Sequence, residues 1–218
     1  MAETLPKLTC ERFPCGPIRT NMYLVLNSLR QSVLIDAAPG SFDAYAKFSQ
    51  SNSNHLSAVL LTHGHWDHFS DAARFQAEGV AIYVSVTDGA WIRRPEYVRD
   101  FVPGELDAKP CAANFYLNHG DSLNFIGVKW QVLAIGGHTP GGLAYYLPSM
   151  QWVFTGDSLF AGTIGRTDLP GGNHAQLIGE IQDRLLQLPP ETQIFPGHGG
   201  SSTIGYEINE NPFTQTKF

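Results

Sequence analysis

The sequence predicts an α/β fold, because short apolar runs alternate along the chain with segments of helical periodicity. Hydrophobic residues make up 43% of the 218 residues and charged residues 16%, a balance that argues against intrinsic disorder. The chain is long enough for one well-cored domain and short for two. Since no long Pro/Gly/Ser linker divides it, we expect one domain over residues 1–218.

The first apolar segments predict two paired strands and a helix. Met22–Leu26 and Val33–Asp36 are apolar runs joined by the turn-like segment Asn27–Gln31. A helix is expected to follow, with Ser41 as its N-cap and an apolar face formed by Phe42, Tyr45 and Phe48.

The next segments predict a βαβ unit. Ser57–Thr62 is a short run rich in β-branched residues and leucine, as in a buried strand. His68–Ala77 has the pattern of a helix ended by Gly79, and Val80–Val86 predicts the next strand. Two strands connected in this way pair in parallel and carry their helix over the sheet.

The second half repeats the mixture of strands and helices. Strands are expected at Val128–Ile135, Gly142–Leu147, Gln151–Thr155 and Thr192–Phe195. Asn173 is expected to cap a helix with leucine and isoleucine about one turn apart, which Pro189 stops. Thr203–Asn209 predicts a short closing helix. Asp88–Phe115 fits the alternation poorly, and we expect it to be a helical insertion, with a flap over the functional site as the alternative.

Charge and composition exclude several classes of protein. The formal net charge of −6 argues against a nucleic-acid or membrane-surface binder. No stretch approaches 18 unbroken apolar residues, so no membrane span is expected. Residues 1–7 lack the basic start and apolar run of a secretory signal. Three cysteines cannot all pair, which suits a reducing compartment, so a cytoplasmic location is expected.

The strongest functional signal is the segment T-H-G-H-W-D-H, which directly follows the predicted strand Ser57–Thr62. It places His63, His65, Asp67 and His68 within six positions. These spacings do not share one helix face, but a loop leaving the strand would fold all four side chains around a metal ion. Neutral imidazole and carboxylate are ligands expected for zinc, iron and similar divalent ions.

Three more fragments place a ligand type just after an apolar strand. His138 lies in the glycine-rich segment 136–142, Asp157 in F-T-G-D-S, and His198 in P-G-H-G. Each signal is weak alone, and Asp157 would equally suit a helix cap or a turn. Loops at one edge of an α/β sheet commonly bind ligands, so the fragments are expected to meet there. The other three histidines, which are His55, His119 and His174, lie in polar segments and are expected at the surface.

Taken in order, these four segments resemble the motifs of the metallo-β-lactamase fold superfamily. They are T-H-G-H-W-D-H, G-H-T-P-G, F-T-G-D-S and P-G-H-G. Within it, the chain resembles the short glyoxalase II-like hydrolases, through T-N-M-Y-L-V from Thr20, G-R-T-D-L from Gly165, Glu207 and the N-P-F segment from Asn211. The resemblance implies a four-layered αβ/βα sandwich with its site at one edge of two sheets.

The resemblance also implies two metal sites. One would use His63, His65 and His138, and the other Asp67, His68 and His198, with Asp157 bridging the two ions. Zinc is the expected metal, with iron or manganese as alternatives. Ligating histidines need oriented second nitrogens, and Asp36, Arg166 and Asp168 are candidates for that role, although Asp36 would also suit a turn and the other two a local ion pair.

The implied activity is hydrolysis of a small-molecule thioester of the S-lactoylglutathione type by a metal-bound hydroxide. Asp67 would bind metal, orient the nucleophile and accept its proton, and Arg166 is a candidate for substrate binding. The chain departs from full-length glyoxalase II at Gly200, where the family has a tyrosine, and Lys217 is the one basic residue after His198. We therefore expect the thiol carrier to be held differently.

Other activities of the superfamily remain open. A persulfide dioxygenase-like oxidoreductase would bind one iron with His63, His138 and Asp157. A β-lactamase or lactonase would use the same site, and a non-catalytic metal-binding module is the simplest alternative. A nuclease would need a larger inserted domain, and a flavodiiron-type protein would have Glu in place of His65. The oligomeric state is not predicted.

Overall fold

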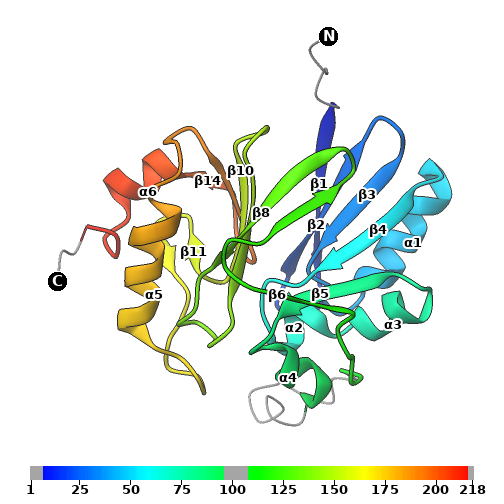
Figure 1. The fold of residues 1–218 in the computed structure, drawn as a ribbon, viewed down its shortest axis with the longest axis horizontal. Helices are drawn as coiled ribbons and strands as arrows, with labels where there is room; N and C mark the ends of the chain where they lie inside the picture. Colours follow the sequence, from blue (N-terminus) through cyan, green and yellow to red (C-terminus); the bar gives the residue numbers. More distant parts are fainter. Residues whose placement is uncertain (1–6, 96–107, 216–218) are drawn as a thin grey trace.

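Two six-stranded sheets face each other and are covered on their outer faces by helices (Figure 1). The structure is a computed structural model and describes residues 7–95 and 108–215. The first sheet is formed by the first half of the chain and the second sheet by the second half. This is the four-layered arrangement that the motif resemblance implies, so the predicted fold class is confirmed.

The first sheet has the strand order β1-β2-β3-β4-β5-β6. Its strands are β1 (Leu8–Cys15), β2 (Thr20–Asn27), β3 (Gln31–Ile35), β4 (His55–Leu60), β5 (Ala81–Ser85) and β6 (Phe115–Leu117). The first three strands are antiparallel, whereas β3 to β6 run parallel. The predicted strand pair and the βαβ unit are therefore confirmed.

The second sheet has the order β14-β13-β10-β9-β8-β7. Its strands are β7 (Ser122–Phe125), β8 (Val128–Ala134), β9 (Leu143–Leu147), β10 (Trp152–Gly156), β13 (Gln193–Pro196) and β14 (Ser202–Thr203). Only β10 and β13 pair in parallel. A small separate hairpin, β11 (Leu159–Phe160) and β12 (Thr163–Ile164), follows β10.

Three apolar clusters hold the four layers together. Between the sheets, Tyr23, Val25 and Ile35 face Trp130, Tyr145 and Phe154. The helices over the first sheet are α1 (Ser41–Asn52), α2 (Trp66–Phe69), α3 (Ala72–Ala77) and α4 (Gly89–Arg93). Over the second sheet lie α5 (His174–Glu180), its π-helical continuation η3 (Ile181–Leu185) and α6 (Ile204–Glu210). Because both faces of each sheet are covered, strands such as β2 are buried almost throughout.

Two local predictions are wrong. Ser41 does not cap α1: Gly40 is the N-cap, and Asp71 accepts a hydrogen bond from the Phe42 N–H at 2.9 Å instead. The single helix expected over His68–Ala77 is split into α2 and α3. The break arises because the backbone there pairs with Ala37, which donates to the His68 carbonyl and accepts from the Asp71 N–H.

Other predictions were incomplete. Asn173 caps α5 as expected, and Thr203 caps α6. Strands β1, β6, β7 and β14 and the β11–β12 hairpin were not predicted. The segment Asp88–Phe115 contains α4 and the first residue of β6, while residues 96–107 within it lie outside the described part of the chain, so its expected role as insertion or flap is untested.

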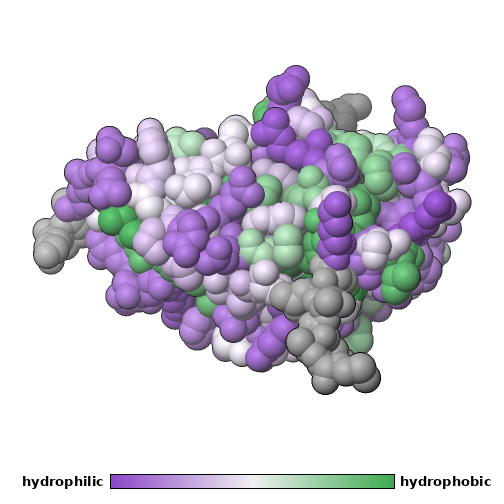
Figure 2. Space-filling model, turned by 90° about the horizontal axis from the view of Figure 1, so that it is seen from above, coloured by the Kyte–Doolittle hydropathy of each residue, from purple (hydrophilic) through white to green (hydrophobic). Residues whose placement is uncertain are grey.

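The surface is mainly hydrophilic when viewed from the end of the sandwich that carries the amino terminus, with hydrophobic residues in smaller groups (Figure 2). Over residues 7–95 and 108–215, no helix combines the length and the apolar character that crossing a bilayer requires. The cysteines Cys10, Cys15 and Cys111 are all free.

Candidate metal centre

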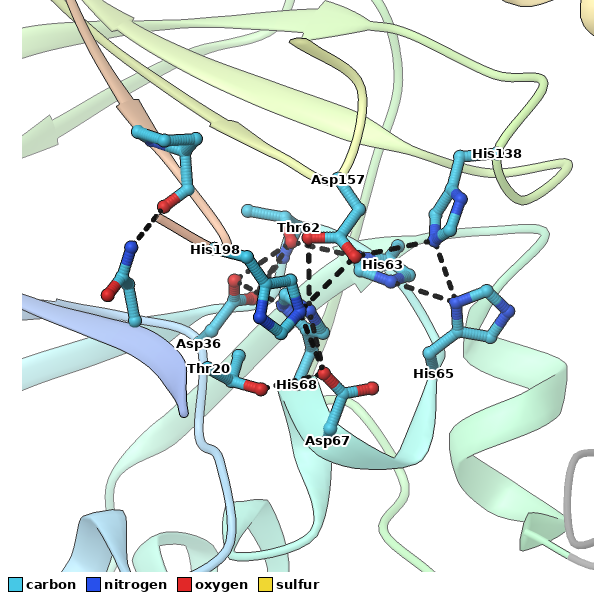
Figure 3. A network of polar contacts seen from close by, with 12 residues as sticks. Thr20, Asp36, Thr62, His63, His65, Asp67, His68, His138, Asp157 and His198 are labelled. Carbon is cyan, nitrogen blue, oxygen red and sulfur yellow. Dashed lines mark hydrogen bonds and ion pairs between the residues drawn. The ribbon is translucent and has the colours of Figure 1, made fainter. Parts of the chain in front are cut away.

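The seven predicted ligands lie together at one edge of the two sheets, where strands of both sheets end (Figure 3). The loop after β4 and helix α2 supply the first group, which comprises His63, His65, Asp67 and His68. The loops after β8, β10 and β13 supply His138, Asp157 and His198 from the second sheet. The strand ends that the sequence placed before each motif therefore converge in space.

One half of the centre consists of three imidazoles. His65 Nδ1 lies 3.1 Å from His63 Nε2 and 2.9 Å from His138 Nε2. All three residues are buried, with side chains from both sheets pointing at one another. Three imidazole nitrogens that converge in this way form a group able to hold a metal ion.

The other half combines carboxylates with imidazoles. Asp67 Oδ2 lies 3.2 Å from His68 Nε2 and 3.3 Å from His198 Nε2. Asp157 stands between the halves, because its Oδ1 is 3.3 Å from His68 Nε2 while its Oδ2 is 3.4 Å from His198 Nε2 and 3.7 Å from His138 Nε2. Asp67, His68 and His198 form a second group able to hold an ion.

Two buried atoms in the centre approach each other to 3.3 Å without forming a hydrogen bond. His68 Nε2 and Asp157 Oδ1 are both shielded from solvent, and neither has a hydrogen bond. A buried polar atom without a partner is costly, and such atoms need an explanation in a native fold. Imidazole nitrogens and carboxylate oxygens aimed at a common point are suitable donors for zinc, iron or manganese. The residues present therefore fit divalent metal ions.

The three-histidine half favours neutral imidazoles. Burial and the neighbouring histidines hold the pKa of His63 well below its ordinary value. Burial, followed by His138, lowers the pKa of His65 to about 3. Imidazole must be unprotonated to bind a metal ion, so both rings are in the ligating form at neutral pH.

The acidic half favours ionised carboxylates. Burial opposes ionisation of Asp67 and Asp157, but His68 and hydrogen bonds with His198 hold the pKa of both carboxyls well below the usual range. The same carboxylates raise the pKa of His68, and they raise that of His198 to about 9, against the effect of burial. A strongly anionic environment of this kind attracts either protons or metal cations.

Most ligands have a second partner that fixes their orientation. His68 Nδ1 lies 2.7 Å from Asp36 Oδ2, and His63 Nδ1 lies 3.1 Å from Thr62 Oγ1. His138 Nδ1 is 2.7 Å from the backbone carbonyl of Arg166. Asp36 thus has the orienting position expected of it, and Arg166 acts through its backbone. Asp168 does not take part, because its carboxylate pairs with the Arg166 guanidinium at 2.7 Å.

Two glycines allow the loops to approach closely. A Cβ atom at Gly197 would lie 2.1 Å from Asp157 Oδ1 and 2.7 Å from His68 Cε1. A Cβ atom at Gly165 would lie 1.8 Å from the Asp157 carbonyl oxygen. Neither position has room for a side chain, which explains the glycine in each motif.

A cleft of about 470 Å³ opens beside the centre. Apolar side chains form much of its wall, and these are Ile18, Trp66, Phe160 and Leu169. Arg166 also lines the cleft, with its exposed guanidinium in a bidentate pair with Asp168. The ligands Asp67, His138 and Asp157 face the same cleft, so a small molecule bound there would reach them.

Sequence reasoning missed two contacts to ligands. Thr20 Oγ1 donates to Asp67 Oδ2 at 2.7 Å, although only its place in the T-N-M-Y motif was noted. Trp91 of α4 stacks on His65 with ring centroids 5.9 Å apart, and nothing local in the sequence indicated this. The three remaining histidines are exposed, as expected: His55, His119 and His174.

Residues 15–198 match the family model of the metallo-beta-lactamase superfamily, and the chain belongs to that superfamily. It is 37% identical over 203 residues to a probable metallo-hydrolase of Streptococcus pyogenes serotype M6, covering 88% of this chain and 84% of the relative. It is 32% identical over 213 residues to the hydroxyacylglutathione hydrolase GloC of Haemophilus influenzae, covering 96% and 100%. The chain is thus a metallo-hydrolase of this superfamily.

Solved structures show the same fold. The BLEG-1 B3 metallo-beta-lactamase has a TM-score of 0.86 at 31% identity, covering 95% of this chain and 100% of its own. TTHA1623 in a di-iron-bound form has a TM-score of 0.80 at 35% identity, covering 93% and 99%. ETHE1 from Myxococcus xanthus has a TM-score of 0.76 at 29% identity, covering 94% and 83%.

Proposed function

We propose that the chain is a metal-dependent thioester hydrolase that uses two divalent ions, with zinc as the expected metal and iron or manganese as alternatives. The convergence of the seven side chains, two of which hold buried atoms without a hydrogen bond, carries this proposal. The ligands of one ion would be His63, His65 and His138, those of the other Asp67, His68 and His198, and Asp157 would serve both. The di-iron form of TTHA1623 supports a two-ion centre.

Divalent ions at this position would lower the pKa of water and polarise an acyl carbonyl. Asp67 faces the cleft and is ionised at neutral pH, so we assign it to orienting the attacking water and accepting its proton. In the reaction the water oxygen bonds to the acyl carbon and the carbon–sulfur bond breaks. The products are a carboxylic acid and a free thiol.

The cleft suits a small molecule with an apolar portion and an anionic portion. Ile18, Phe160 and Leu169 would contact apolar atoms of the substrate, and Arg166 would pair with a carboxylate in place of Asp168. Similarity to GloC over nearly the whole chain supports an S-acylglutathione as the substrate.

The test is hydrolysis of S-lactoylglutathione by zinc-loaded protein, which is measured through the free thiol that the reaction releases. Asp67→Ala and His138→Ala are expected to abolish turnover. His174→Ala changes an exposed histidine and is expected to leave turnover unchanged. The proposal is wrong if folded, zinc-loaded protein cleaves neither this compound nor simpler acyl thioesters.

One observation favours a second candidate, a persulfide dioxygenase with a single iron. His138 Nε2 and Asp157 Oδ2 are 3.7 Å apart beside His63, which supplies the two histidines and one carboxylate of a facial iron site. Similarity to ETHE1 from Myxococcus xanthus adds support. One iron per chain and O2 consumption with glutathione persulfide would favour this activity over hydrolysis.

A further inference from the structure

Asp88 is a buried carboxylate that lies behind the three-histidine half of the centre. Its Oδ2 accepts hydrogen bonds from the Gly64 N–H at 2.9 Å and from Thr139 Oγ1 at 2.7 Å. Its Oδ1 accepts from the Gly141 N–H at 2.8 Å. The side chain has no solvent exposure, so these three donors replace water around the carboxylate.

The three donors belong to the two loops that carry the histidines. Gly64 separates His63 from His65, whereas Thr139 and Gly141 follow His138. These loops come from different sheets and are far apart in the sequence. Asp88 therefore links the two loops, and it does not line the cleft.

The segment that carries Asp88 is itself fixed against the centre. Ser85 Oγ accepts from the Asp88 N–H at 3.1 Å, and Asp88 directly precedes α4, whose Trp91 stacks on His65. Asp88 packs closely against the loop that contains Gly141, because a Cβ atom at Gly141 would lie 2.5 Å from Asp88 Oδ1.

Strand β2 supplies the contacts that hold the other half of the centre. Thr20 at the start of β2 donates to Asp67, as described above. Asn21 Nδ2 donates to the carbonyls of Pro196 at 2.9 Å and Gly199 at 3.0 Å, on either side of His198. Tyr23 Oη donates to the same Pro196 carbonyl at 2.8 Å. These contacts share no residue with those of Asp88.

We propose that Asp88 is a positioning residue for the three-histidine metal site, and that it acts on this site independently of the Asp67, His68 and His198 site. The proposal rests on the metal centre of the proposed function. A carboxylate is needed because it accepts from all three donors at once. An asparagine would turn an N–H toward one of them, and the two loops would separate.

Zinc titration followed by long-range 1H–15N spectra of the histidine side chains tests this directly, because the spectra show which imidazoles bind. In the unaltered protein, zinc is expected to shift all five ligand histidines. In Asp88→Asn, zinc binding at His63, His65 and His138 is expected to weaken about tenfold to a hundredfold, while binding at His68 and His198 is retained.

Asn21→Ala is the matched control, since it removes contacts to the His198 loop and is expected to weaken His198 selectively. Thr139→Val removes one donor to Asp88 with little change in volume. This variant is used for the test if circular dichroism shows that metal-free Asp88→Asn has an altered fold.

Unchanged zinc binding at the three histidines, or equal weakening of both sets, would overturn the role of Asp88. Absence of zinc binding in the unaltered protein would instead overturn the proposed function.

Discussion

Asp36 Oδ2 lies 2.7 Å from His68 Nδ1 and turns the opposite nitrogen of that ring toward Asp67 and Asp157. Asp36 itself adopts a left-handed backbone conformation with φ of 62°. Its Oδ1 accepts from the Thr62 N–H at 2.7 Å, directly before the first histidine motif. A carboxylate behind a ligating imidazole fixes the ring and increases its basicity.

Asp36→Asn is expected to weaken metal binding and activity about tenfold to a hundredfold, because the amide keeps the shape but not the charge behind His68. Asparagine also tolerates the left-handed conformation, so the fold should persist. Zinc affinity measured against a competing chelator checks this. Asp43→Asn removes an exposed carboxylate paired with Arg74 and serves as the control. Equal affinities in both variants would contradict the assigned role.

Gly197→Ala is expected to disrupt the centre, since its Cβ atom would meet both Asp157 and His68. We expect more than about a tenfold loss of zinc affinity, with a loss of stability of about 1–3 kcal/mol from overpacking. Gly200→Ala lies three residues further on, with no atom within 4 Å of its Cβ position. This matched variant should bind zinc normally, and a similar loss in both would indicate a general loop effect.

Removing metal is expected to lower the thermal stability. A ligand at a hundredfold excess over its Kd stabilises the folded state by about 2.7 kcal/mol. For a chain of this length that corresponds to a decrease in Tm of about 5–10 °C. Calorimetry with zinc and with EDTA measures the difference. His138→Ala should reduce it and His174→Ala should not, and an equal Tm with and without zinc would show that no metal stabilises the fold.

Arg166→Ala is expected to raise KM for an S-acylglutathione roughly fivefold, with little change in kcat. The backbone carbonyl that orients His138 is retained in this variant. Asp168→Asn frees the guanidinium from its exposed partner and should lower KM. Steady-state kinetics of the two variants provide the comparison, and a shift in the same direction in both would argue against substrate binding by Arg166.

The partly buried thiol of Cys10 and the buried thiol of Cys111 should react slowly in the folded protein. Burial raises the pKa of Cys111 to about 11 and that of Cys10 to about 12. Unfolding returns both to their ordinary value of about 8.5. The folded state therefore holds more protons between about pH 9 and 11, and the free energy of unfolding should fall as pH rises through this range. Thiol titration with and without denaturant, and unfolding curves across pH, check both points. Rapid labelling of the native protein at neutral pH would contradict the raised pKa of these thiols.

The convergence of the seven candidate ligands could be predicted from the sequence because their signal is local. His63, His65, Asp67 and His68 follow one apolar strand within six positions, and the other motifs also begin at strand ends. The role of Asp88 has no such signal, since it depends on two loops that only the folded chain brings together. Ser41 illustrates the same limit, because the capping contact to α1 comes from Asp71, which directly precedes α3.

The edge strands were hard to predict for a related reason. In β1, buried residues occur mainly at the ends, so Leu8–Cys15 lacks a regular alternation. Strand β6 has three residues and obtains its conformation from pairing with β5. In both cases tertiary pairing, rather than local preference, determines the structure.

The hydrogen bond from the Leu143 N–H to the Thr62 carbonyl, at 2.8 Å, joins the two sheets beside the metal centre. Each half of the chain supplies only part of either candidate metal site. A nascent chain that has folded its first sheet alone would therefore present an incomplete set of donors and retain metal poorly. Tight metal retention would then be a late event in folding. Metal content would distinguish native protein from protein misfolded at the interface between the two sheets.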